Sequence, residues 1–91
     1  MEITFDPAKK ARNLRERGIS FELAADFDFQ TAVFVEDTRE DYGEIRIRAL
    51  GFIGDRLHAL VFTMRGTALP VISLRKANRK EVNRYEKAAQ S

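Results

Sequence analysis

The segment IRIRALGFIGDRLHALVFTMRGTALPVISLR, residues 45–75, contains three runs of residues typical of β-strands. The runs cover residues 45–52, 57–65 and 69–75, and the pairs Gly54-Asp55 and Gly66-Thr67 occupy the two connections. Connections this short join antiparallel neighbours, because a parallel pair needs a crossover of a dozen or more residues. The segment therefore predicts an antiparallel sheet.

Residues two apart on a strand share one face of the sheet, so the alternation in these runs predicts two unlike faces. The apolar face, predicted to be the core, would carry Ile45, Ile47, Ala49, Leu60, Phe62, Met64, Ile72 and Leu74. The opposite face would carry four arginines from three consecutive strands, together with Val61, Thr63, Val71 and Ser73; the arginines are Arg46, Arg48, Arg65 and Arg75.

The flanking sequence supplies helices and two more strands. Asp6 and Pro7 are typical of a helix start, and Gly18 is typical of a helix end. Ser20 starts a second short helix, to about residue 26, and residues 3–5 and 31–36 favour strands. Asn78 and Glu81 form a capping-box pattern for a final helix, with Val82, Tyr85 and Ala89 facing inward. The predicted order is β-α-α-β-β-β-β-α, an α+β fold forming a single domain over residues 1–91.

The charges are segregated along the chain, although the formal net charge is only +2. Residues 9–17 and 75–87 are strongly basic, whereas residues 20–44 contain eight acidic residues and only one arginine, Arg39. The basic ends indicate an anionic partner for one surface, and solvated surface charge is the alternative. The chain begins without a secretory signal and has no apolar run of membrane-spanning length, so we expect a cytoplasmic protein.

The residue types limit the available chemistry. The chain has no cysteine, and its single histidine, His58, lies in an apolar run without evident catalytic partners. We therefore expect no metal site and no cofactor. Arginines are suited to phosphate, and RNA supplies its own nucleophile, the 2′-hydroxyl. Preorganised cations can promote its attack, and Glu44, Tyr42 and Tyr85 are candidates for proton transfer.

A series of short motifs resembles one protein family. The matching residues are Phe5-Asp6 with Lys9 and Asn13; Gly18-Ile19-Ser20-Phe21; Tyr42-Gly43-Glu44-x-Arg46; Gly51; Phe62-Thr63-x-Arg65-Gly66; and Ile72-Ser73-Leu74-Arg75-Lys76-Ala77, then Glu81 and Tyr85-Glu86. In this order and spacing they resemble the BrnT toxins, the RNA-cleaving half of a bacterial type II toxin–antitoxin pair. Two residues depart from the family pattern: Arg17 replaces a usual histidine, and Pro70 replaces a common basic residue.

The resemblance implies a RelE-like fold and an endoribonuclease that works without a metal ion. It also implies a cognate antitoxin with a ribbon-helix-helix domain, through which the complex would bind operator DNA. Combined with the four arginines that alternation places on one face of the predicted sheet, the resemblance gives a predicted site. The predicted catalytic residues are Glu44, Arg46, Arg65 and Arg75. Arg65 and Arg75, at the ends of neighbouring predicted strands, are expected to hold one phosphate together. The predicted RNA-binding residues are Lys9, Lys76, Arg79, Lys80, Arg84 and Tyr85.

Two other functions fit the same residues. The cations would only position phosphates in a non-catalytic module that binds nucleic acid or an antitoxin. The basic surface would match an acidic partner in a plain interaction protein, which would show no salt-dependent binding of RNA.

Overall fold

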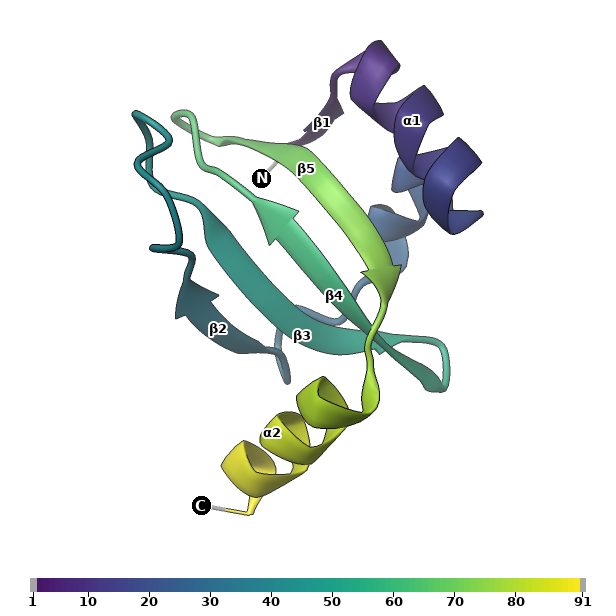
Figure 1. Cartoon of the computed structure of the whole chain (residues 1–91), viewed down its shortest axis with the longest axis vertical. Helices are drawn as coiled ribbons and strands as arrows, with labels where there is room; N and C mark the ends of the chain where they lie inside the picture. The colour runs from purple at the N-terminus through teal and green to yellow at the C-terminus, as the bar shows by residue number, and fades with distance from the viewer. Residues whose placement is uncertain (1, 91) are drawn as a thin grey trace.

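The computed structural model describes residues 2–90 and confirms the α+β class (Figure 1). The elements in chain order are β1 (Glu2–Phe5), α1 (Pro7–Arg17), the 3₁₀ helix η1 (Phe21–Asp26), β2 (Val33–Glu36), β3 (Ile47–Ile53), β4 (Arg56–Phe62), β5 (Ala68–Lys76) and α2 (Arg79–Ala89). The second predicted helix is thus a 3₁₀ helix. No helix within residues 2–90 is long and apolar enough to cross a membrane.

The five strands form one sheet in the order β1-β5-β4-β3-β2 (Figure 1). Strands β3 to β5 are antiparallel neighbours, as predicted from the short turns, and β2 pairs antiparallel with β3 after a longer connection. Strand β1 is different, because it pairs with β5 in parallel, with Ile3 opposite Leu69. The sheet is therefore mostly, not wholly, antiparallel.

The predicted helix ends are confirmed. The Asp6 carboxylate accepts hydrogen bonds from the backbone of Ala8 and Lys9 at the start of α1, and Gly18 ends that helix with a left-handed φ of 70°. Asn78 and Glu81 form the predicted capping box at the start of α2. These contacts satisfy backbone groups that a helix end leaves without partners.

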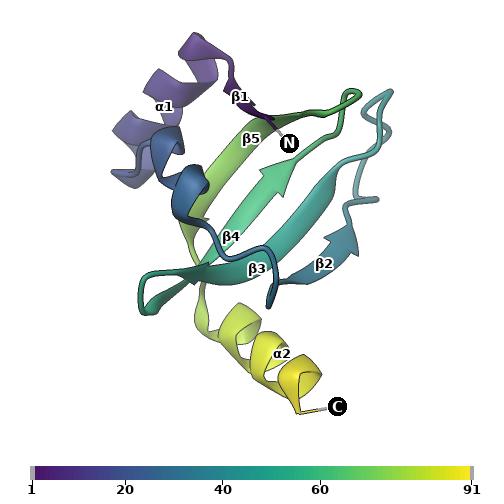
Figure 2. The same ribbon diagram turned by 180° about the vertical axis from the view of Figure 1, so that it is seen from behind.

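The main core lies between one face of the sheet and η1, which covers that face (Figure 2). Its buried residues are Ile19, Phe21, Ala24, Phe27, Ala49, Leu60, Phe62, Leu69, Val71 and Leu74. Phe62 is only 5% exposed, as predicted. The predicted burial of Ile45 and Met64 is wrong, because both lie outside β3 and β4 and are exposed. Alternation fixes the face of a residue only within the paired strand.

A β-bulge in β5 changes the predicted faces of two residues. Val61 pairs with Ser73 and Phe62 pairs with Val71, so Ile72 has no partner on β4. The extra residue moves Val71 into the core, although the alternation placed it on the arginine side. Ile72, predicted to be in the core, instead lines a cleft beside Arg46.

The other face of the sheet, which carries Arg46, Arg48 and Arg75, is called the arginine face below. Helix α2 covers one end of it. There Leu50, Leu57, Ala59 and Ala77 form a second buried cluster, against which Phe52, Val82 and Tyr85 pack. Val82 and Tyr85 thus face inward as predicted, whereas Ala89 is exposed, contrary to the prediction.

Candidate functional site

Arg75 lies at the end of the arginine face that α2 covers. It pairs with Ala59 across the sheet, and its guanidinium donates two hydrogen bonds to the Glu81 carboxylate, at 2.7 and 2.9 Å. These hydrogen bonds lower the pKa of Glu81 and raise the pKa of Arg75, because each charge stabilises the other. Glu81 also accepts from the Asn78 backbone in the capping box. Arg75 therefore joins the sheet to the start of α2.

Arg65 and Arg75 do not lie together, contrary to the prediction that they would hold one phosphate. Arg65 follows β4 and bridges to Ala68, at the opposite end of β5 from Arg75. Ala68 and Arg75 are seven positions apart on an extended strand, a distance of roughly 20 Å. In an antiparallel pair the end of one strand lies beside the start of the next, so these two residues mark opposite ends of the face.

A glutamate joins two of the predicted arginines at the end of the arginine face that α2 does not cover, which is called the open end below. Glu44 Oε1 accepts a hydrogen bond from Arg65 at 3.1 Å, and Glu44 Oε2 lies 3.8 Å from Arg46 Nε. The Glu44 side chain is 29% exposed, so solvent reaches this carboxylate. The structure thus brings together three of the four predicted catalytic residues, Glu44, Arg46 and Arg65.

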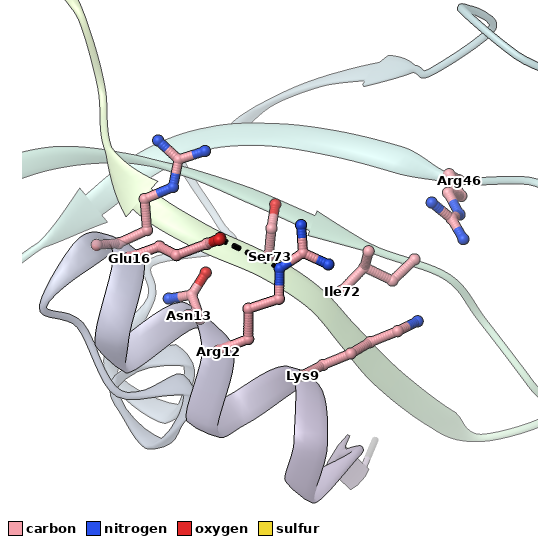
Figure 3. Close-up of a pocket in the computed structure, with 8 residues that line it drawn as sticks. Lys9, Arg12, Asn13, Glu16, Arg46, Ile72 and Ser73 are labelled. Atoms are coloured by element: carbon pink, nitrogen blue, oxygen red, sulfur yellow. Dashed lines mark hydrogen bonds and ion pairs between the residues drawn. The ribbon is translucent and has the colours of Figure 1, made fainter.

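Two clefts of about 320 and 310 Å³ open beside these residues. Lys9 and Ile72 line both of them. The first cleft is also lined by Arg12, Asn13, Glu16, Arg17, Arg46 and Ser73. The second is also lined by Thr4, Phe5, Asp6, Glu44, Thr63, Arg65, Pro70 and Val71. Figure 3 shows Lys9 extending from α1 past Ile72 toward Arg46.

Asn13 fixes α1 beside these clefts. Strand β1 pairs with β5 only as far as Val71, which leaves the next part of the β5 edge without a strand partner. The buried Asn13 amide occupies that edge: it donates to the Leu74 carbonyl at 2.8 Å and accepts from the Leu74 backbone N–H at 3.3 Å. A second donation, to the Ile19 carbonyl at 2.9 Å, ties it to the chain after α1. One amide therefore replaces a pair of ladder hydrogen bonds.

The remaining predicted RNA-binding residues lie at the α2 end. Lys76, Arg79, Lys80 and Arg84 are exposed, and none has an ion pair within residues 2–90. Tyr85 packs its ring edge-on against Phe52, and its hydroxyl donates to the Thr31 carbonyl at 3.0 Å. The phenol thus joins α2 to the segment before β2. Of the predicted RNA-binding residues, only Lys9 lies at the clefts.

Several cleft residues were absent from the predicted site. Arg12, Glu16 and Arg17 come from α1, and Ser73 comes from the strand just past the bulge. The signal for the first three was the basic run over residues 9–17, in which positions three or four apart share a helix face. Arg17 and Pro70, the two departures from the family pattern, each line one cleft.

The side chains at this end define what the site can do. Among residues 2–90, no three His, Cys, Asp or Glu side chains gather in a way that could hold a metal ion. Cations gather instead around the partly buried carboxylate of Glu44. Such an arrangement can bind a phosphate, stabilise added negative charge on it and accept a proton.

Comparison with known proteins assigns a family to this arrangement. The model of the ribonuclease toxin BrnT of type II toxin–antitoxin systems matches residues 5–81. This span includes α1, all of the residues that line the first cleft, all but Thr4 of those that line the second, and the Arg75–Glu81 pair. A search of the curated proteins finds no match. Membership of such a family implies ribonuclease activity, with RNA as the substrate and a cognate antitoxin as the partner. The chain belongs to the BrnT family of ribonuclease toxins of type II toxin–antitoxin systems.

Proposed function

We propose that the protein is an endoribonuclease that cleaves RNA at the open end of the arginine face, without a metal ion. The observation that carries this proposal is the Glu44 carboxylate between Arg46 and Arg65, at the junction of two clefts that share Lys9. A phosphate oxygen can take the place of a carboxylate oxygen on either guanidinium, because both are acceptors that suit the planar donor set.

In the proposed reaction the 2′-oxygen of the substrate attacks the adjacent phosphorus. Arg46 and Arg65 stabilise the negative charge that grows on the phosphoryl oxygens, and Glu44 accepts the proton of the 2′-hydroxyl. The bond to the 5′-oxygen breaks, and Lys9, which lines both clefts, donates a proton to that oxygen. The products are a 2′,3′-cyclic phosphate and a 5′-hydroxyl end. The substrate thus supplies its own nucleophile, whereas metal-dependent nucleases use a metal-bound water.

The bulged Ile72 has a second part in this proposal. Its apolar side chain lines both clefts, and in the first cleft it lies beside Lys9 and Ser73. An aliphatic surface beside phosphate-binding cations suits the apolar face of a ribose or base, because single-stranded RNA is bound through both its backbone and its bases.

The test is cleavage of a defined RNA by the purified protein in the presence of EDTA. We expect shortened products with 5′-hydroxyl ends, and no cut at a position where the substrate carries a 2′-deoxyribose. An Arg46→Ala preparation purified in parallel should cleave about a hundredfold more slowly, so contaminating nucleases can account for no more than that residual rate. A strict requirement for a divalent metal, or cleavage of the 2′-deoxy substrate, would contradict the proposal. Binding without any product would instead favour the non-catalytic module.

We also infer that the cognate antitoxin carries a ribbon-helix-helix domain and that operator DNA is bound only by the complex. The support is the family match over residues 5–81. Gel-shift measurements with the operator, comparing toxin alone, antitoxin alone and the complex, test this inference. A shift by the toxin alone would contradict it.

A further inference from the structure

The guanidinium of Arg46 is held by a ring rather than by hydrogen bonds. Its Cζ lies 3.9 Å from the centroid of the Tyr42 ring. Arg46 Nε is buried without a hydrogen-bond partner, and within residues 2–90 the guanidinium makes no hydrogen bond at all. A cation over an aromatic face is attracted by the quadrupole of the ring, and an arginine also stacks on it through its flat shape. This attraction fixes the plane of the group and leaves its outer donors available.

The Tyr42 ring is itself held in place through its hydroxyl group. Its hydroxyl donates to Asp37 Oδ2 at 3.4 Å, and Asp37 is buried. Arg39 holds the same carboxylate through two hydrogen bonds, at 2.8 and 2.7 Å. The phenol therefore rests against a carboxylate that is already anchored, so the ring has a defined position.

The backbone around Tyr42 supports the same geometry. Asp37 N–H donates to the Arg46 carbonyl at 2.7 Å and closes the loop between the two residues. Gly43 follows Tyr42 with a left-handed φ of 72°, and its N–H donates to Asp41 Oδ1 at 3.1 Å. A residue with a side chain adopts this conformation at a cost, so glycine lets the chain reverse here. The reversal returns the chain to Arg46, three residues after Gly43, where the ring and the guanidinium meet.

We propose that Tyr42 is a positioning residue for RNA cleavage, which acts by holding Arg46 against the face of its ring and not by proton transfer through its hydroxyl. The inference rests on the function proposed above. The hydroxyl is directed to the buried Asp37, and Tyr42 lines neither cleft. Arg46 lines the first cleft, so the ring reaches the substrate only through Arg46.

This role predicts which kinetic constant changes. A guanidinium held in one orientation stabilises the charge of the transition state without reorganising, whereas a loosely held guanidinium still attracts the phosphate of the substrate. Losing the ring face should therefore lower kcat by about tenfold or more and change KM by much less. Losing only the hydroxyl removes one long hydrogen bond and leaves the stacked pair in place.

The experiment compares Tyr42→Leu with the conservative Tyr42→Phe, and measures kcat, KM and melting temperature for each. Tyr42→Leu should lose about tenfold or more in kcat, and Tyr42→Phe should recover most of that loss. The same two substitutions are then made in an Arg46→Ala background. There Tyr42→Leu should cause little further loss, because two residues that act as a unit are not additive. A purely structural tyrosine would lower activity in both backgrounds.

Three outcomes would overturn the inference. Full cleavage by a folded Tyr42→Leu variant would show that the ring is not needed. Loss of cleavage in Tyr42→Phe would assign the function to the hydroxyl, and this isosteric variant decides the question even if Tyr42→Leu fails to fold. Additive losses in the Arg46→Ala background would show that the two residues act separately. A metal requirement of the wild type would contradict only the proposed reaction, because the variants can be ranked in any buffer that supports cleavage.

Discussion

Arg46 and Arg75 lie on the same face of the sheet and are similarly buried, with side chains 23% and 28% exposed. They differ in how the protein holds them. Arg75 gives two short hydrogen bonds to Glu81, which is 7% exposed and belongs to a helix cap. Arg46 has a glutamate at 3.8 Å and a tyrosine ring, and makes no hydrogen bond within residues 2–90.

The comparison shows that burial and charge alone do not separate a structural arginine from one available to a substrate. Arg75 already uses three of its N–H donors, two on the Glu81 carboxylate and one on the Lys76 carbonyl, so fewer of them remain for a phosphate. The guanidinium of Arg46 makes no hydrogen bond within residues 2–90 and keeps its outer donors for a substrate. The two ends of one face therefore differ: Arg75 connects the sheet to α2 at one end, and the other end is where we propose that RNA is cleaved.

The largest expected effect contrasts the two arginines directly. Arg46→Ala should lower kcat by about a hundredfold, because it removes a preorganised cation from the reacting phosphate. Arg75→Ala should lower the melting temperature, with a much smaller loss of kcat, because Arg75 binds Glu81 at the far end of the face. Cleavage assays well below both melting temperatures measure the contrast.

The same pair of variants tests the catalytic role that the sequence predicted for Arg75. A folded Arg75→Ala protein that has lost cleavage would support that role and weaken the distinction between the two ends. Arg75→Lys separates the effect of the charge from that of the contact, because a lysine keeps the charge but cannot make the two-point contact with Glu81.

The second effect is on stability, at the covered end. Glu81→Gln should lower the free energy of unfolding by about 2 kcal/mol, because it leaves the partly buried Arg75 without its anion. In a chain of this length that loss corresponds to a fall in melting temperature of roughly 10 °C. Glu86→Gln, on an exposed position of the same helix, is the matched control. Equal melting temperatures for the two variants would contradict a structural role for the Arg75–Glu81 pair.

The local parts of this structure were predictable from the sequence. Asp6 and Asn78 accept hydrogen bonds from residues two or three positions away, so their roles as helix caps follow from nearby residue types. The alternation of arginine with apolar residues in β3 likewise gave the arginine face, because Arg48 lies within a regularly paired strand.

The bulge and the tertiary contacts were not predictable in the same way. Val71 and Ile72 are both β-branched and apolar, so no difference in residue type indicates which of them the bulge turns outward. The Asn13–Leu74 contact joins residues 61 positions apart and depends on where β1 ends. The prediction that Arg65 and Arg75 hold one phosphate was wrong for another reason: the predicted antiparallel order itself places those two strand ends apart, so the error lay in the inference and not in the topology.

The third expected effect concerns how far RNA extends along the molecule. If RNA runs from the clefts to α2, replacing Lys80 and Arg84 by Gln should reduce the salt dependence of binding by about 1.4 log units per log of salt, as expected for two lost contacts on a single strand. This reduction should appear with a long RNA and vanish with an oligonucleotide that fits the clefts alone.

Replacing Lys9 and Arg17 by Gln is the matched control. It should reduce the salt dependence for both RNAs, because these residues line the clefts. An unchanged slope in the Lys80/Arg84 variant with long RNA would show that this surface of α2 is only solvated.

The smallest expected effect concerns the stability contributed by Asp37, the carboxylate that accepts a hydrogen bond from the Tyr42 hydroxyl. Hydrogen bonds from Arg39 lower the pKa of Asp37 from 3.8 to about 2. A carboxylate whose pKa is lower in the folded protein stabilises the fold above its unfolded pKa, and this contribution disappears as the pH falls through the folded value. The stability that Asp37 provides should therefore be complete above about pH 5 and be lost progressively down to about pH 2. Because the Arg39 side chain is 64% exposed, solvent screens the pair, and we expect only about 1 kcal/mol.

Denaturant unfolding of the wild type and of Asp37→Asn, followed from pH 6 to pH 2, measures the difference. The two curves should converge as the pH approaches 2, because the wild-type carboxylate then becomes neutral like the amide. Glu81 also has a lowered pKa, but it is present in both proteins, so its own titration cancels in the comparison. A constant difference across the whole range would mean that the Asp37 charge does not hold the loop that carries Tyr42 and Arg46.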